Sequence, residues 1–290
     1  MKTVLIPTDF SENGYNAVRY GVQLFGRQPC TFILLNTFLP AGMNTGNGIN
    51  FPVPITADDY DEQNSLNGLK RTLSKINGDF SGLDHHFETI SSLNLLVEAI
   101  MDQIAERSID LIIMGTQGAT GARELFLGST TQKVISGINN CPLLVIPSKS
   151  EYRPWHHIGF ATNFDRHYKK WQIAPLKAFT NLQDSTIKIV HVLDRAGMSD
   201  GQLRGRGELD ALLDGVKKDH LAIENHGSIE KTIMAAAQEM GVDVLALIHY
   251  KHGFLEQLIR EPVVKRINFH TGIPLLVLPQ NDRLPRTKAR

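Results

Sequence analysis

The chain of 290 residues is predicted to fold as two tandem α/β domains, each with a parallel sheet between layers of helices. Three observations support this prediction. Short apolar runs alternate with longer helical patterns, the same alternation occurs twice, and the length suits two domains of ordinary size. Apolar residues make up 42% of the chain and charged residues 21%, which is typical of a globular protein.

The repeat is visible in the letters of the sequence. The segment from Asp110 to Pro147 begins DLIIMG and ends CPLLVIP, and the segment from Asp243 to Pro279 begins DVLALI and ends IPLLVLP. The two units also start alike, with VLIPTDFS from Val4 and IGFATNFD from Ile158. One unit therefore occupies about half of the chain. We predict domains at 1–148 and 153–281, joined by the polar linker 148–154.

Within the first unit, each element has its own signal. Continuous apolar runs with β-branched residues predict buried parallel strands, and apolar residues at helical spacing predict helices. Ser11 is predicted to cap the first helix. The predicted strands are 3–7, 32–36, 86–90, 111–114 and 143–146, and the predicted helices are 11–25, 58–76, 93–104 and 129–138. The second unit follows the same order, which requires right-handed crossovers in a parallel sheet.

Composition excludes several classes of protein. Thirty Lys and Arg balance thirty Asp and Glu, which gives no electrostatic argument for a nucleic acid or a membrane surface as partner. No apolar stretch approaches the roughly 20 residues of a membrane-spanning helix, and no signal peptide is recognisable. Cys30 and Cys141 lie far apart in sequence and fit a disulfide-free, cytoplasmic protein.

The most informative segment follows the fourth predicted strand. Gly115 and Gly118 allow a tight turn and a close approach of a ligand to the backbone. Gly128 and Ser129 lie at the start of the next helix, where unpaired amides and the helix dipole favour an anion such as phosphate. Ser129 is also expected to form a capping box with Gln132. The alternative is that the glycines only build a turn and that Ser129 only caps the helix.

This segment resembles the universal stress protein family, whose ATP-binding members carry G-x2-G-x9-G-[ST] at this place. Gly115, Gly118, Gly128 and Ser129 match that motif without a gap, and the start PTDFS and the end PLLVIP are also similar to the family. The resemblance extends over nearly the whole chain. It implies two five-stranded sheets of the Rossmann-like HUP type, each in the order 3-2-1-4-5, and a ligand crevice where the strand order reverses.

The resemblance also implies a set of nucleotide-binding residues. The adenosine end would be lined by Pro7, Thr8 and Asp9, with Thr37 meeting adenine through its backbone and Met114 packing nearby. Ribose and phosphates would lie on Gly115, Gly118, Gly128, Ser129, Thr130 and Thr131. The implied ligand is ATP, with or without Mg²⁺. For Asp9 the alternative is a turn carboxylate at the start of the first helix.

The second unit departs from this motif. Every loop glycine is replaced, and Asn163 stands at the position of Asp9. The residues aligned with Gly115, Gly118, Gly128 and Ser129 are Ile248, Lys251, Arg260 and Glu261. A carboxylate at the helix start would repel phosphate. We therefore expect that this unit does not bind ATP in the family's manner. Nine of the 11 histidines lie in this half, so a metal site is an open alternative to scattered polar histidines.

No motif for catalysis is found. The chain has no Walker A loop, no GxGxxG and no GxSxG, and Ser129 has no identifiable activating base. We expect a nucleotide-binding regulatory protein with no enzymatic activity. A protein partner would recognise the surface that nucleotide binding changes. The alternatives are a slow Mg²⁺-dependent ATPase and a nucleotide-free scaffold. The apolar closing strands predict that the two halves pair as a pseudo-dimer within the chain, to which a homodimer is a further alternative.

Overall fold

The computed structural model describes residues 1–39, 56–116, 128–193, 197–225, 227–250 and 272–282. Residues 40–54, Gly118 and most of the second unit's degenerate loop lie outside these residues. The first half contains five strands and four helices in alternation: β1 Lys2–Pro7, α1 Glu12–Phe25, β2 Cys30–Phe38, α2 Thr56–Asp79, β3 His86–Leu93, α3 Leu96–Glu106, β4 Leu111–Gly115, α4 Ser129–Gly137 and β5 Leu143–Ile146.

The second half repeats the order of strands as far as it is described. Its elements are β6 His157–Ala161, α5 Lys170–Gln183, β7 Thr186–Leu193, α6 Asp200–Leu212, β8 Lys218–Glu224, α7 Ile229–Glu239, β9 Val244–Ile248 and β10 Leu275–Leu278. The predicted elements of the first half are all present. Strand β2 and helix α2 are both longer than predicted.

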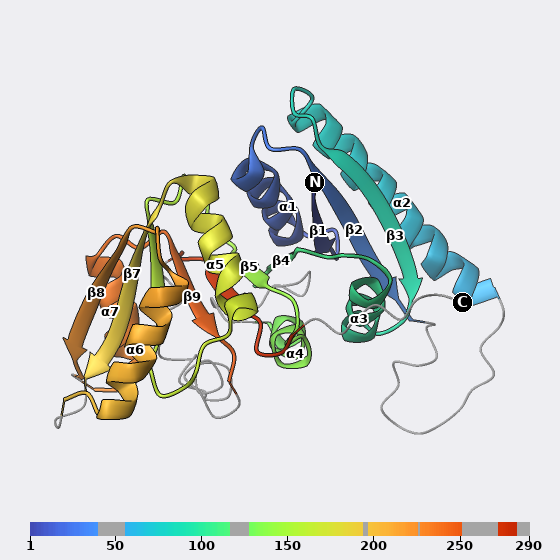
Figure 1. Ribbon diagram of the computed structural model, residues 1–290. Coiled ribbons are helices and arrows are strands. Elements are labelled where there is room, and N and C mark those ends of the chain that lie inside the picture. Colours follow the sequence, from blue (N-terminus) through green and yellow to red (C-terminus); the bar gives the residue numbers. More distant parts are fainter. Residues whose placement is uncertain (40–55, 117–127, 194–196, 226, 251–271, 283–290) are drawn as a thin grey trace, which may run out of the picture.

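All ten described strands form one sheet in the order β3-β2-β1-β4-β5-β10-β9-β6-β7-β8 (Figure 1). Each half, followed inward from its outer edge, has the order 3-2-1-4-5 with parallel neighbours. The predicted α/β class is therefore confirmed, and the two predicted five-stranded sheets are joined into one. The halves join through β5 and β10, which pair antiparallel, as expected for closing strands that pair within the chain.

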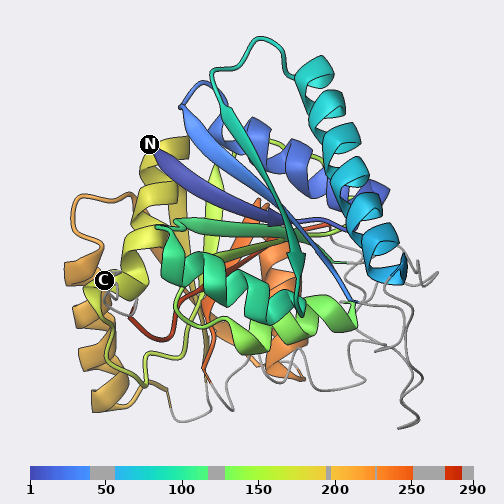
Figure 2. The same cartoon turned by 90° about the vertical axis from the view of Figure 1, so that its right-hand side faces the viewer.

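Side chains that alternate along the strands fill two cores. Val4 and Ile6 of β1 point into the core under α1 and α2, while Leu5 points into the core under α3 and α4. In the second half, α5 and α6 cover the same face as α1 and α2, and α7 lies on the face of α3 and α4. Figures 1 and 2 show the resulting three layers. Because each central strand is covered on both faces, it carries a continuous apolar run.

The predicted linker is packed against the first half. The carbonyl of Ser150 accepts a hydrogen bond from Asn16 Nδ2 (2.9 Å), and the ring of Tyr152 meets Tyr20 edge-on at 5.3 Å. Trp155 is fully buried, and its Nε1 donates to the hydroxyl of Tyr20 at 2.8 Å. The segment that connects the halves is thus part of the core between them.

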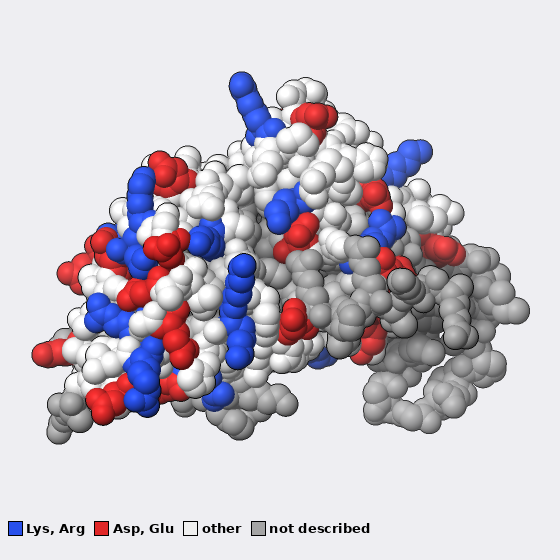
Figure 3. All heavy atoms as spheres, in the orientation of Figure 1, with Lys and Arg blue, Asp and Glu red and all other residues white. Residues whose placement is uncertain are grey.

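The distribution of charge on the surface was compared with the expectation that neither a nucleic acid nor a membrane surface is a partner. On the face shown in Figure 3, Lys and Arg lie interspersed with Asp and Glu, with no large patch of a single sign. Of the helices in the described part of the chain, none combines the length and the apolar character needed to cross a bilayer.

Candidate functional site

A pocket of about 620 Å³ lies at the carboxyl ends of β1, β2 and β4, where the strand order of the first half reverses. Its walls come from the loop after β1, the end of β2, the starts of α3 and α4 and the end of β4. The volume falls within the range of roughly 300–1,000 Å³ that small-molecule sites occupy. The crevice predicted from the resemblance is therefore present.

The loop after β1 is built around its own hydrogen bonds. Asp9 Oδ1 accepts from the backbone N–H of Ser11 at 3.1 Å and from its hydroxyl at 2.6 Å. Thr8 Oγ1 accepts from the N–H of Phe10, which has a left-handed backbone with φ of 64°. Ser11 then caps α1 by accepting from the N–H of Gly14 at 3.0 Å, as predicted. Asp9 thus shapes this turn and also lines the pocket.

A packing contact that the sequence did not reveal explains why residue 115 is a glycine. A Cβ at this position would lie 2.5 Å from Asn13 Nδ2 in the first turn of α1. The glycine at the end of β4 therefore allows α1 to approach the strand closely, in addition to any approach of a ligand. Substitution by alanine would force Asn13 to move, beside the pocket wall.

The start of α4 differs from the prediction in one detail. Gly128 occupies the N-cap position, with no side-chain cap, and Ser129 is the first helical residue. The expected capping box from Ser129 is therefore wrong, because its side chain lies one position too far along the helix to cap it. The hydroxyl of Thr131 instead donates to the carbonyl of Gly115 at 3.0 Å, which ties α4 to the end of β4. That proton is then not available to a phosphate.

The structure brings most of the predicted nucleotide-binding residues together. Those that line the pocket are Pro7, Thr8, Asp9, Thr37, Met114, Gly115, Thr130 and Thr131. Gly128 and Ser129 are not among its lining residues, although they begin the helix that forms one wall. Gly118 lies outside the described residues.

Sequence reasoning missed several groups in this pocket. Asn36 donates from Nδ2 to the carbonyl of Thr8 at 2.7 Å and so fixes the loop after β1. Asn94 and Glu98 lie at the start of α3, and Lys133 lies on the pocket side of α4. Lys133 could have been found, because it follows Thr130 by three residues and so shares its helical face. The groups on α3 carried no motif.

The second half keeps the loop geometry but changes its chemistry. Phe164 has φ of 59°, matching Phe10, and follows Asn163 where the first half has Asp9. His191 Nδ1 lies 3.1 Å from the carbonyl of Thr162 and is buried. The sheet register places His191 opposite Thr162 in the way that Asn36 meets Thr8. His191 is thus the counterpart of a structural amide.

Two other histidines of this half lie beside carboxylates. His220 Nε2 lies 2.8 Å from Asp210 Oδ1, and His167 Nδ1 lies 2.8 Å from Glu208 Oε1. Within the described ranges, no group of three or more histidine, cysteine or carboxylate side chains is arranged to hold a metal ion. His252 and His270 lie outside those ranges.

Comparison with known proteins identifies the family. The model of the universal stress protein family matches residues 1–147, which is half of the chain. The chain therefore belongs to the universal stress protein family. Universal stress protein MJ0577 of Methanocaldococcus jannaschii is 25% identical over 157 residues, covering 51% of this chain and 96% of that protein. Universal stress protein YxiE of Bacillus subtilis is 26% identical over 145 residues, covering 49% and 97%.

The tandem arrangement also occurs in a solved structure. A universal stress protein from Archaeoglobus fulgidus superposes with a TM-score of 0.66 at 14% identity, covering 96% of this chain and 98% of that one. The likeness extends over both halves, so the whole described fold is shared. At this identity it shows the fold alone.

Proposed function

We propose that the first half binds an adenine nucleotide, ATP, and that a protein partner responds to its occupancy. The main support is that residues from separate parts of the sequence line one pocket. Thr8 and Asp9 after β1, Thr37 in β2, Met114 at the end of β4 and Thr130 in α4 are distant in sequence, yet they line one pocket of suitable size. The family resemblance assigns the first four of these residues to the adenosine end and Thr130 to the ribose and phosphates.

The chemistry of the walls suits the two ends of the ligand. Met114 is 95% buried and offers an apolar surface for a base. Thr37 lines the same pocket, where its backbone can meet the base. At the other end, the first amides of α4 have no partner within the helix, and its dipole is positive there. Lys133 lines the same wall and adds a positive charge.

Two carboxylates, Asp9 and Glu98, also line the pocket and oppose a highly charged anion. A divalent cation would offset that repulsion, and carboxylate and phosphate oxygens are the ligands Mg²⁺ prefers. We therefore propose that ATP binds together with Mg²⁺. Adding EDTA should then weaken ATP binding measured by calorimetry, and equal affinity with and without Mg²⁺ would contradict the proposal.

Gly128 offers a matched pair of variants to test the site. Its φ of −57° and ψ of 150° are open to any residue, and both Asp and Asn are favourable N-caps. Gly128→Asn should keep the fold and most of the affinity for ATP. Gly128→Asp should fold as well but bind ATP at least tenfold more weakly, since its carboxylate would lie where phosphate is proposed. Equal affinity of the two variants would refute the placement of the phosphates.

We further propose that the protein is a cytoplasmic binder rather than an enzyme, and that the second half is structural or contacts the partner. Asn163 in place of Asp9 and the loss of the loop glycines support this division of roles. Purified protein mixed with an equimolar amount of ATP should release no detectable phosphate over several hours. Release of phosphate that continues until the bound ATP is consumed would favour a slow ATPase instead.

A further inference from the structure

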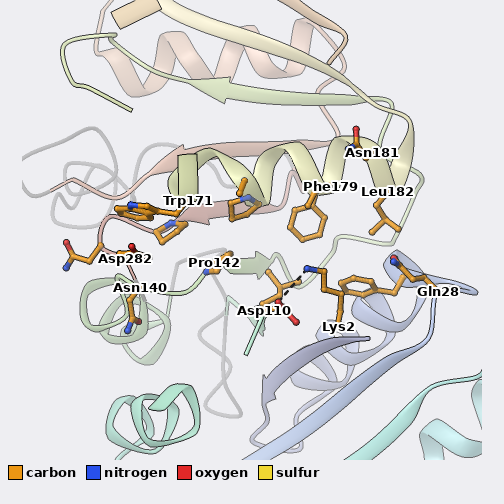
Figure 4. Close-up of a pocket in the computed structure, with 17 residues that line it drawn as sticks. Lys2, Gln28, Asp110, Asn140, Pro142, Trp171, Phe179, Asn181, Leu182 and Asp282 are labelled. Carbon is orange, nitrogen blue, oxygen red and sulfur yellow. Dashed lines mark ion pairs between the residues drawn. The ribbon is translucent and has the colours of Figure 1, made fainter. Parts of the chain in front are cut away.

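A second pocket, of about 750 Å³, lies at the opposite end of the strands, beside the starts of β1 and β4. It is a groove between the first half and the outer side of α5 (Figure 4). Trp171, Phe179 and Leu182 of α5 form one wall, and Lys2, Asp110 and Pro142 lie on the opposite side. No residue of this pocket lines the nucleotide pocket.

An approximate twofold axis relates this groove to another place in the molecule. Leu144 of β5 pairs directly with Leu276 of β10, its equivalent in the repeat, so the axis passes between them. The starts of the two halves are also equivalent. The N–H of Thr3 donates to Asp110, and the N–H of His157 donates to Asp243 in the same way. Counting back two residues, Met1 is the equivalent of Trp155.

The two equivalent places are filled differently. Trp155 lies between α5 and α1, with its ring 5.3 Å from that of Phe179 and its Nε1 bonded to the hydroxyl of Tyr20. In the symmetric place, between the end of α1 and the face of α5, the side chain of Met1 is 81% exposed and fills nothing. The groove beside Lys2 and Phe25 is thus the unfilled counterpart of the indole site.

The site that Trp155 fills indicates which kind of ligand suits its unfilled counterpart, the groove beside Phe25. Phe25 takes the place of Phe179, while Trp171 lines the groove farther along, at the start of α5. Ala174 and Ala178 are small, so they leave room for a ring on the face of α5. Pro175 lies inside α5 and has no N–H, so the carbonyl of Trp171 lacks the donor that residue 175 would normally supply. That carbonyl can accept a hydrogen bond from a ligand.

Charge narrows the class of ligand further. Lys2 Nζ and Asp110 Oδ1 lie 3.5 Å apart as an ion pair, so the lysine is already neutralised. The lining also contains the carboxylate of Asp282, which disfavours an anion. The other polar groups are amides such as Asn140 and Asn181 at the ends of the groove. Such a site favours an uncharged ligand, because burying an unpaired charge is costly.

We propose that this groove binds a neutral, planar aromatic molecule that carries an N–H or O–H donor, of the indole or phenol type. The proposal is independent of nucleotide binding, since it concerns the other end of the sheet. The ring would pack beside Phe25, against Ala174 and Ala178 of α5, as Trp155 packs beside Phe179 in the filled copy.

The neutral fluorophore N-phenyl-1-naphthylamine tests the proposal, because its aromatic rings carry one N–H and its emission rises in apolar surroundings. Titration of the full chain should give a saturable rise with one site per chain. Ala178→Trp, which places a ring in the groove, should weaken binding by about tenfold or more. Ala211→Trp, at an exposed alanine of α6 outside the groove, should bind like the parent protein.

Competition and folding controls complete the experiment. Indole should displace the fluorophore at lower concentration than 1-octanol, and ATP should not displace it. Thermal unfolding of both tryptophan variants would verify that they are folded. The proposal is overturned if binding does not saturate, if folded Ala178→Trp binds as tightly as Ala211→Trp, if octanol competes better than indole, or if ATP displaces the fluorophore.

Discussion

The ring of Phe10 lies directly against Gly68 of α2, where a Cβ added to the glycine would come within 2.7 Å of Phe10 Cδ2. The second half repeats this relationship, since Gly205 of α6 lies against the backbone of Phe164. In both halves a glycine on the second helix therefore accommodates a phenylalanine with positive φ, directly after Asp9 or Asn163. The helix, the strained loop and the pocket wall are linked through that contact.

Substituting Gly68 by alanine should destabilise the protein. The ring of Phe10 has to move, which we expect to cost about 1–3 kcal/mol as overpacking does. Gly78→Ala is the matched control, because it lies in the same helix with nothing within 4 Å, and it should stabilise by up to about 1 kcal/mol. Urea unfolding measures both. Equal stabilisation by the two variants would show that Phe10 is not held by this contact.

Gly205→Ala should be more harmful than Gly68→Ala. The added Cβ would come well under 3.0 Å from the carbonyl oxygen of Phe164, and a backbone atom yields less readily than the edge of a ring. Gly207→Ala, two residues along α6 with open space around it, is the control. We expect a drop in melting temperature of several degrees for Gly205→Ala only. The prediction fails if both variants melt together.

Removing the hydroxyl of Tyr20 should weaken the packing between the halves. In Tyr20→Phe the buried Nε1 of Trp155 loses its acceptor, and an unsatisfied buried donor costs about 1–3 kcal/mol. Tyr168→Phe removes another buried hydroxyl, bonded to Thr162 within the second half, and serves as a comparison. Denaturant unfolding followed by tryptophan fluorescence measures the change. The assignment would be refuted by unchanged stability of Tyr20→Phe.

Stability should depend on the protonation of His85. Burial lowers the pKa of His85 below its usual value of 6.5, so the folded state binds fewer protons than the unfolded chain. The stabilisation from the neutral ring is complete above about pH 6.5 and is lost as the pH falls through the folded pKa. His85→Phe should flatten this part of the stability profile, while His86→Phe, at an exposed neighbour, should not. Parallel profiles for His85→Phe and the parent would contradict the prediction.

Much of the architecture was predictable because it depends on periodic patterns. The apolar runs of β1 and β4 and the cap at Ser11 follow from local chemistry, and the motif located the pocket wall at α4. The remaining features arise from contacts across long sequence separations. Asn13 beside Gly115, Asn36 holding Thr8, and Trp155 bonded to Tyr20 all depend on how packed elements meet. The capping error at Ser129 arose because one residue of register decides which side chain reaches the helix start.

The antiparallel pairing of Leu143–Val145 with Leu275–Val277 has a consequence for assembly. Both partners belong to one polypeptide, so their association is intramolecular and does not weaken on dilution. It also occupies the inner strand edge of each half. Among the described strands, only β3 and β8 remain at the rims of the sheet. Any growth of this sheet by a second molecule would have to begin there.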